Sequence, residues 1–147
     1  MSEAVKVIIT QQKNYQFLVD FGDAIPTLIA DESIPLGEGE GPTPTHFLLA
    51  GVANCISASL LFALQKFKQD AGGITTTATC TMGRNAQNRI RVQSIDIHIA
   101  FKKPGSELDN IARILEQFEA FCTVGQSVQE GIPVKVSVVD GAGVQLK

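Results

Sequence analysis

Two cysteines stand where sulfur chemistry is expected. Cys55 lies in an apolar stretch among small residues such as Gly51 and Ala58, which leave room for backbone or a substrate near the sulfur. Cys122 lies where a short helix is expected to begin, and the unpaired N–H groups of a helix start stabilise a thiolate. A thiolate attacks the O–O bond of a peroxide to give sulfenic acid, and a second thiol closes a disulfide. Spacing alone does not bring the two sulfurs together, and the alternative is that both are buried small hydrophobes.

The other residues able to do chemistry point elsewhere. Cys80 falls in a Thr-rich strand and is assigned to packing. The two histidines are His46 and His98, and neither has a cysteine or histidine at metal-binding spacing. His98 is expected to be solvated, beside Asp96 on the polar face of a strand. The sequence therefore gives no sign of a metal site.

The segment that carries Cys55, residues 43–68, predicts a long helix. Thr43 suits the N-cap and Pro44 the first turn. Apolar residues occur on nearly every side of this helix, which is typical of a buried central element. Polar residues such as His46 and Asn54 interrupt its apolar run, so no membrane span is expected.

Short segments with alternating or β-branched residues predict six strands, at residues 4–10, 14–20, 25–30, 74–83, 89–101 and 133–139. Arg91 shares its parity with Ile95 and Ile97, so the fifth strand is expected to change face near residues 92–94. An amphipathic helix is predicted at 106–121, with a short helix after Cys122. Residues 31–42 are expected to form a flexible connector, or alternatively a lid over Cys55. The order βββ-α-ββ-α-(α)-β indicates an α+β fold.

The composition bounds the function classes. A chain of 147 residues that is 44% hydrophobic is expected to form one domain, residues 1–147, with a real core. The net charge is −3 and no basic run occurs, which argues against nucleic-acid binding. The N-terminal residues lack the features of a secretory signal. Three cysteines do not suit a disulfide framework, so a cytoplasmic location is expected.

Two motifs resemble one known family. The run GPTPTHFLLAGVANC, ending at Cys55, and FCTVGQSV, which contains Cys122, are similar to the cysteine motifs of the OsmC/Ohr family (osmotically inducible protein C and organic hydroperoxide resistance proteins). The resemblance extends over nearly the whole chain through the order of its elements. It implies an OsmC-like fold that forms an intertwined homodimer with active sites at the interface. It also implies reduction of organic hydroperoxides, with Cys55 attacking, Cys122 resolving and a dithiol as reductant. No cofactor, whether metal, flavin or haem, is implied.

The chain departs from the family pattern at two positions. In the hydroperoxide reductases an arginine from the N-terminal strands pairs with the thiolate, and a glutamate just after the motif proline holds it. Here Thr45 stands in the place of that glutamate, and the first arginine is Arg84. Loss of both partners leaves neither charge unpaired. It also removes the family's reason for Cys55 to ionise.

Thr45 and His46 remain as candidate thiolate-supporting or substrate-binding residues, with Lys13 as a further candidate cation. His46 precedes Cys55 by nine residues and faces nearly the opposite side of the helix. Only a partner chain or a bend would bring it to the sulfur. Two alternatives to a peroxidase therefore stay open: an OsmC-like protein that binds hydrophobic ligands with little or no catalysis, and a redox sensor.

Overall fold

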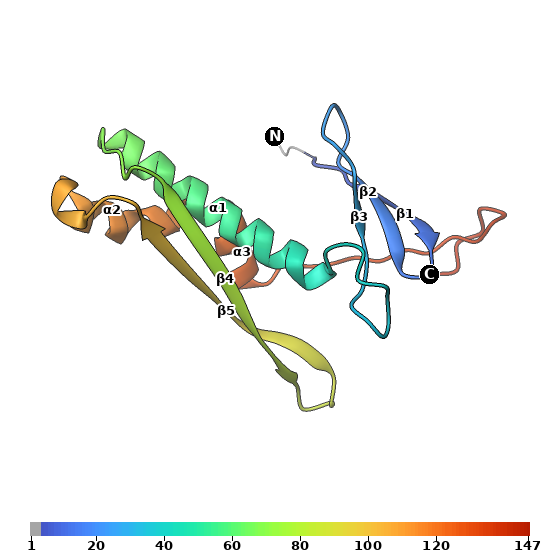
Figure 1. Cartoon of the computed structure of the whole chain (residues 1–147). Coiled ribbons are helices and arrows are strands. Elements are labelled where there is room, and N and C mark those ends of the chain that lie inside the picture. The colour runs from blue at the N-terminus through green and yellow to red at the C-terminus, as the bar shows by residue number, and fades with distance from the viewer. Residues whose placement is uncertain (1–3) are drawn as a thin grey trace. The chain divides into compact units, whose positions relative to one another are not determined.

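The computed structural model describes residues 4–147, which fold as a mixed α+β chain (Figure 1). The predicted fold class is confirmed. The chain divides into two compact units, Met1–Asn54 with Ile74–Ala100, and Cys55–Gly73 with Phe101–Lys147. In chain order the elements are β1 (Ile8–Lys13), β2 (Gln16–Asp20), β3 (Leu28–Ala30), α1 (Pro44–Lys66), β4 (Ile74–Arg84), β5 (Ile90–Phe101), the 3-10 helix η1 (Gly105–Glu107), α2 (Ile111–Gln117), the 3-10 helix η2 (Phe118–Phe121) and α3 (Thr123–Glu130).

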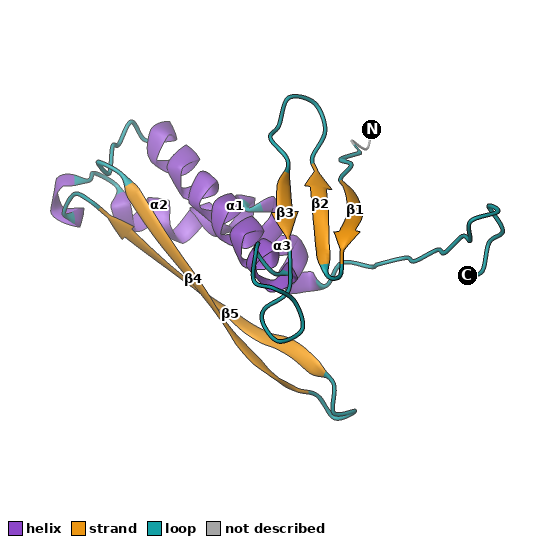
Figure 2. Cartoon of the chain, turned by 45° about the vertical axis from the view of Figure 1, so that its right-hand side comes forward, coloured by secondary structure: helices purple, strands orange, loops and turns teal. Residues whose placement is uncertain are grey.

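The first unit contains both sheets. Strands β1, β2 and β3 form an antiparallel sheet in that order, and β4 and β5 form a two-stranded sheet, as Figure 2 shows. The first hairpin turns at Asn14, whose φ of 50° is one that asparagine tolerates better than most residues. Five of the six predicted strands are present. The first begins at Ile8, later than expected, and the third is reduced to three residues.

Strand β5 changes face as predicted. Val92 is half-buried, and the next half-buried residues are Ile95, Ile97 and Ile99, so the inward parity switches between residues 92 and 95. Arg91 is therefore exposed although it shares its parity with the isoleucines.

Residues 31–42 form an ordered loop around one carboxylate, where a flexible connector was expected. Asp31 is only 2% exposed. Its oxygens accept hydrogen bonds from the backbone N–H groups of Glu32 at 2.7 Å, Glu40 at 3.0 Å and Glu38 at 3.2 Å. The Gln16 side-chain amide donates to it at 3.5 Å. A buried charge is stable only when it is paired or hydrogen-bonded in this way.

Helix α1 begins where the sequence predicts. Thr43 caps it: the His46 N–H donates to the Thr43 hydroxyl at 3.4 Å, and the Thr43 N–H donates to His46 Nδ1 at 3.0 Å. This reciprocal pair satisfies two N–H groups that a helix start leaves free.

The predicted burial of α1 on all sides does not hold for the single chain. Its buried residues are Val52, Leu60 and Leu64, whereas Leu61 and Phe62 are 48% and 68% exposed. By length and mean hydropathy, 2.1 over its best window, α1 is also apolar enough to cross a membrane. The expectation that its polar residues exclude a span on composition is therefore wrong, although core helices of globular folds meet the same two criteria.

The second unit contains the last part of α1, the helices after β5 and the C-terminal segment. The single helix predicted for 106–121 is broken, because Leu108 is extended and Asn110 adopts the left-handed conformation with φ 60°. The short helix after Cys122 is confirmed as α3. The buried side chains of this unit are Leu60, Leu64, Ala71, Leu108, Ile114, Phe118 and Cys122.

The strand predicted at 133–139 is not formed among the described residues. Residues 131–147 are exposed, and their sheet pairing is one isolated bridge between Val139 and Gln145. A strand forms only when a neighbour satisfies its backbone groups. The alternation of apolar and polar residues that predicted this strand does not show whether a neighbouring strand is present.

Candidate active site

The two sulfur atoms singled out from the sequence meet in the second unit. Cys55 projects from α1, and Cys122 is the residue that caps α3. Their side chains are hydrogen-bonded to each other. Both are free thiols, as is Cys80. The structure therefore brings together a pair that spacing alone left undecided.

The first turn of α3 points its N–H groups at these sulfurs. The Val124 N–H donates to Cys55 Sγ at 3.4 Å, and the Gly125 N–H donates to Cys122 Sγ at 3.3 Å. These amides have no partner within the helix, because the first four N–H groups of any helix lack one. Cys122 has φ −79° and ψ 99°, the extended conformation of an N-cap, and its sulfur takes the place of a capping oxygen.

Hydrogen bonding lowers the pKa of Cys55. The Val124 N–H is the largest cause, and it outweighs the desolvation that raises the pKa. The Cys122 thiol and the amides of Gly125 and Thr123 lower the pKa further. Donors to the sulfur favour its charged form, so Cys55 holds a thiolate more readily than an ordinary cysteine does.

The pKa of Cys122 is shifted the other way. Burial is the largest cause of the increase, and the side chain is 1% exposed. The neighbouring Cys55 raises the pKa too, because two thiolates in contact repel each other. The Gly125 amide and the Ser59 side chain oppose this increase without reversing it. The helix start that was expected to favour a thiolate at Cys122 does donate to that sulfur, but burial outweighs the effect, so Cys55 is the thiol of the pair that ionises more readily.

Glycine at position 125 allows the close contact with Cys122. A Cβ placed there would lie 2.8 Å from Cys122 Sγ, closer than such atoms approach. Val124, Gly125 and Ser59 are the site residues that sequence reasoning did not identify. The signal for Ser59 was present, since it follows Cys55 by four residues on one helix face.

The proposed supporting residues have other observed surroundings. The His46 ring bonds Thr43 in the helix cap, nine residues before Cys55. Thr45 lies in the first turn of α1 and is half-buried. Lys13 pairs with Glu38 at 3.4 Å. The groups that lower the pKa of Cys55 come instead from residues 122–125.

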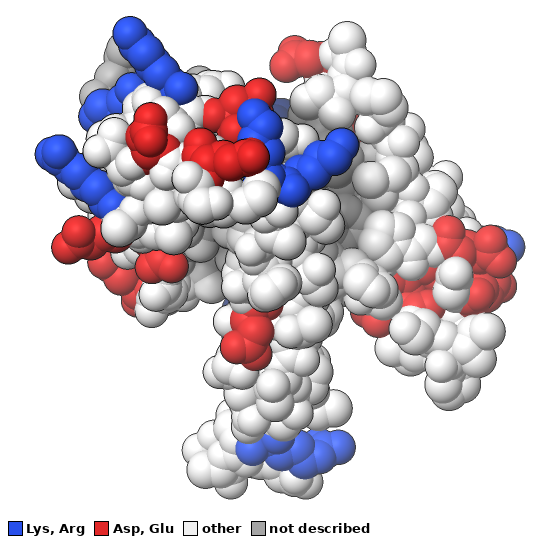
Figure 3. Space-filling view, turned by 60° about the vertical axis from the view of Figure 1, so that its left-hand side comes forward, with Lys and Arg blue, Asp and Glu red and all other residues white. Residues whose placement is uncertain are grey.

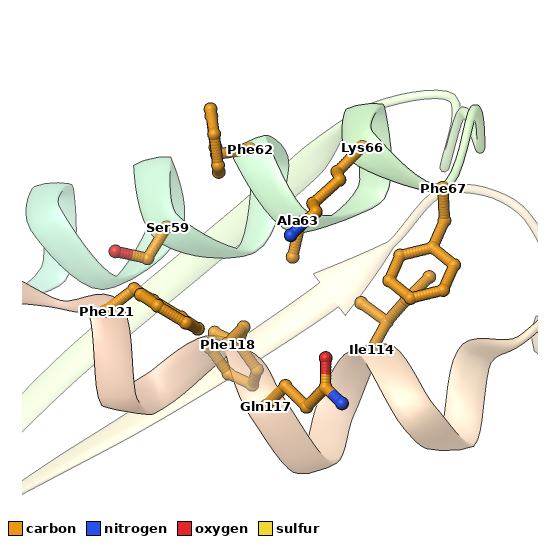
Figure 4. Close-up of a pocket in the computed structure, with 9 residues that line it drawn as sticks. All are labelled: Ser59, Phe62, Ala63, Lys66, Phe67, Ile114, Gln117, Phe118 and Phe121. Carbon is orange, nitrogen blue, oxygen red and sulfur yellow. The ribbon is translucent and has the colours of Figure 1, made fainter.

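A small apolar pocket adjoins the thiol pair through Ser59, which both lines the pocket and bonds Cys122. Its volume is ≈ 70 Å³. Figure 4 shows Phe67, Ile114 and Phe118 between α1 and the α2–η2 segment, with the Lys66 amino group on the pocket side. The lining residues are Ser59, Phe62, Ala63, Lys66, Phe67, Ile114, Gln117, Phe118 and Phe121. Such a lining suits an apolar organic group, and Lys66 is its one ionisable side chain.

The described residues contain no group of three or more His, Cys, Asp or Glu side chains able to hold a metal ion. Figure 3 shows one face, on which basic and acidic side chains are interspersed over its upper part and most of the surface is uncharged. On this face no continuous basic area marks a nucleic-acid surface.

Comparisons with known proteins agree with the resemblance seen in the motifs. The sequence model of the OsmC-like protein family matches residues 37–137. An OsmC-like protein of unknown function from Vibrio cholerae O1 has a solved structure with TM-score 0.71 and 19% identity, covering 88% of this chain and 95% of that chain. An organic hydroperoxide resistance protein OsmC from Legionella pneumophila has TM-score 0.68 and 14% identity, covering 91% and 96%.

An organic hydroperoxide resistance protein from Elizabethkingia anophelis has TM-score 0.67 and 18% identity, covering 92% of this chain and 96% of that chain. No curated protein matches the chain in sequence. At these identities the solved structures establish the fold alone. Together with the match over residues 37–137, they confirm the predicted family. The chain is a member of the OsmC-like protein family.

Proposed function

We propose that the protein is a thiol-dependent peroxidase that reduces organic hydroperoxides, with Cys55 as the attacking thiol and Cys122 as the resolving thiol. The observation that carries the proposal is the Val124 N–H bond to Cys55 Sγ, beside a second thiol already in contact. This amide takes the part that a cation plays in the family's hydroperoxide reductases. Solved relatives named as organic hydroperoxide resistance proteins share the fold and support the choice of substrate class.

The reaction has three balanced steps. The Cys55 thiolate attacks the outer peroxide oxygen, the O–O bond breaks, and the alkoxide takes up a proton and leaves as an alcohol, which makes Cys55 a sulfenic acid. Cys122 then attacks the Cys55 sulfur, and the hydroxyl leaves with the Cys122 proton as water. A dithiol reductant finally opens the disulfide by exchange and becomes a disulfide itself.

The assembly we propose is a homodimer. Apolar side chains of α1 and of the C-terminal segment are exposed in the single chain, among them Phe62 at 68% and Val134 at 82%. Exposure of this kind marks an interaction surface. Sedimentation velocity should give a mass near twice 15.7 kDa. A monomer at micromolar concentration would contradict the dimer without touching the thiol chemistry. The cytoplasmic location belongs to the same proposal, because the reductant must keep these thiols free.

The test of the function is peroxide consumption with a small dithiol as reductant. Wild type and Cys80→Ser should consume cumene hydroperoxide catalytically, whereas Cys55→Ser should be inactive. In the absence of the dithiol, Cys122→Ser should react once and leave a Cys55 sulfenic acid with no internal disulfide. Full turnover by Cys55→Ser would exclude the proposal.

A second candidate function is binding of an apolar ligand without turnover, and the phenylalanine-lined pocket favours it. The pocket volume of ≈ 70 Å³ is small beside the roughly 300–1,000 Å³ of ordinary ligand sites. This pocket therefore holds no more than a short alkyl or phenyl group. Native mass spectrometry that finds a retained lipid, together with no peroxide turnover, would favour binding over catalysis.

A further inference from the structure

Ser59 links the attacking and resolving cysteines. It follows Cys55 by one helical turn on α1, so the two side chains lie on the same face. The Ser59 side chain hydrogen-bonds the Cys122 sulfur. The same serine lines the apolar pocket. Among the described residues of α1, Cys55 and Ser59 are the two whose side chains bond the Cys122 sulfur.

Cys122 depends on such contacts because water scarcely reaches it. The side chain is 1% exposed, and its observed hydrogen-bond partners are the Gly125 N–H at 3.3 Å, Cys55 and Ser59. A charge that develops on a buried atom must be stabilised by neighbouring donors. The Gly125 amide and the Ser59 hydroxyl are two such donors to Cys122.

The disulfide-forming step is the step that needs these donors. Once Cys55 is a sulfenic acid it no longer carries the negative charge that disfavours ionisation of Cys122. Cys122 then gives up its proton, the S–S bond forms, and the Cys55 S–O bond breaks to release water. During this attack the Ser59 hydroxyl donates to a sulfur that is becoming anionic, and hydrogen bonds to charged groups are the stronger ones.

We propose that Ser59 is a positioning residue for Cys122. It holds the resolving sulfur against Cys55 and accelerates disulfide formation. It therefore determines how much of the Cys55 sulfenic acid is oxidised further before the disulfide forms. The proposal rests on the proposed peroxidase function. Slow formation of the Cys55–Cys122 disulfide, a step we call closure, leaves the sulfenic acid exposed to a second peroxide, which converts it to sulfinic acid.

Among the described residues, the groups that contact Cys122 or line the adjoining pocket come from α1, α2, η2 and α3. On α1 the titratable neighbour in contact is Cys55, and Lys66 is the ionisable side chain of the adjoining pocket. On η2 Glu119 meets Cys122 through its carbonyl oxygen, which accepts the Cys122 N–H at 3.1 Å. On α3 the contact is the Gly125 amide. A change in the pH dependence of closure on removing Ser59 is therefore attributable to the lost hydroxyl.

The experiment separates attack from closure in proteins that all carry Cys80→Ser. Ser59→Ala removes the hydroxyl and keeps a good helix former, and Ser59→Thr retains the hydroxyl as the conservative control. Stopped-flow mixing with cumene hydroperoxide measures the attack on Cys55. Dimedone trapping at successive times measures the lifetime of the sulfenic acid, and intact mass measures the sulfinic acid, all between pH 6 and 9.

With Ser59→Ala we expect the rate of attack on Cys55 to stay within about twofold of the wild-type rate. The rate of closure should fall by about tenfold, because this is the effect typical of losing one hydrogen bond to a charged group. The pH profile of closure should move to higher pH, sulfinic acid should accumulate, and Ser59→Thr should restore all three. Closure at the wild-type rate, or slowing equal at every pH with a lowered Tm, would overturn the proposal. Failure of the peroxidase function is distinct, because wild type itself would then form no sulfenic acid.

Discussion

The Val124 N–H donates to Cys55 Sγ at 3.4 Å, which joins the first turn of α3 to a cysteine 69 residues earlier in the chain. The helix start supplies partial positive charge without a cationic side chain. It lowers the pKa of Cys55 in a chain that lacks the arginine and glutamate of the family pattern. A neutral donor of this kind is also insensitive to pH.

The first prediction concerns the pH dependence of Cys55. Its pKa is lowered by donors that favour the thiolate, so reactivity should rise with pH and level off below the pH at which an ordinary cysteine does. Alkylation by iodoacetamide in a Cys80→Ser, Cys122→Ser variant should show this midpoint, with a cysteine peptide as control. The variant lacks the Cys122 donor, so the remaining shift measures the amides. A midpoint at or above that of the peptide would contradict the assignment.

The second prediction removes the donor itself. Val124→Pro eliminates the N–H that reaches Cys55 at a first-turn position where the helix does not need it, and should raise the pKa of Cys55. Attack at neutral pH should slow by roughly tenfold. Val124→Ala keeps the N–H and should react as wild type does.

Proline at 124 also disfavours helical geometry at Thr123. Thr123→Pro is the milder companion, because proline suits the first helical position and Cys122 before it is already extended. It removes the smaller contribution of the Thr123 amide and should slow attack less than Val124→Pro does. Unchanged rates in both proline variants would exclude α3 as the source of thiolate stabilisation.

The third prediction concerns the 31–42 loop. Burial raises the pKa of Asp31, but the N–H groups of Glu40, Glu32 and Glu38 and the Gln16 amide outweigh it, so the net pKa is lowered. A carboxylate with a lowered folded-state pKa stabilises the fold above its unfolded-state pKa. That stabilisation is lost as pH falls through the folded-state value.

Asp31→Asn should therefore lower the Tm at pH 7, and its difference from wild type should shrink in acid. Thermal melts between pH 3 and 7 measure this. Glu40→Gln, which neutralises an exposed carboxylate in the same loop, is the matched control and should stay near wild type. If the difference in Tm between Asp31→Asn and wild type did not change with pH, the variant would be acting through loop packing and not through loss of the charge.

The fourth prediction is a stabilisation at the end of α1. The Gln69 N–H donates to the Leu64 carbonyl at 2.8 Å and the Lys68 N–H to the Gln65 carbonyl at 2.9 Å, which is a Schellman ending. Its left-handed residue is Lys68, with φ 58°. Lys68→Gly should stabilise the protein by about 1 kcal/mol, because glycine adopts this conformation without a Cβ clash. Lys68→Ala keeps the Cβ and should give little gain in chemical denaturation.

Much of the fold follows from local signals in the sequence. Residue types and periodicity predict the Thr43 cap, the helix α1 and the change of face near Val92. The break at Asn110 was missed because the apolar spacing of a helix continues across it. The prediction of a strand at 133–139 was wrong, because strand pairing depends on a neighbouring strand that the alternation of apolar and polar residues does not reveal.

The candidate site, too, could be predicted only in part from the sequence. Both cysteines carry local signals, but the pKa of Cys55 is lowered by α3 amides that approach it only in the folded chain. Backbone N–H groups belong to every residue type except proline, so no letter of the sequence marks them. A cation was therefore expected near Cys55, with His46 and Lys13 as candidates, whereas the backbone groups that lower its pKa are the amides of residues 123–125.

The central claim is that peroxide oxidises Cys55 and that Cys122 captures it. The most direct measurement is non-reducing peptide mapping by mass spectrometry after fully reduced protein receives one equivalent of cumene hydroperoxide. The account predicts a Cys55–Cys122 disulfide within one chain and an unmodified Cys80. Thiols that remain intact, or a disulfide through Cys80, would contradict it.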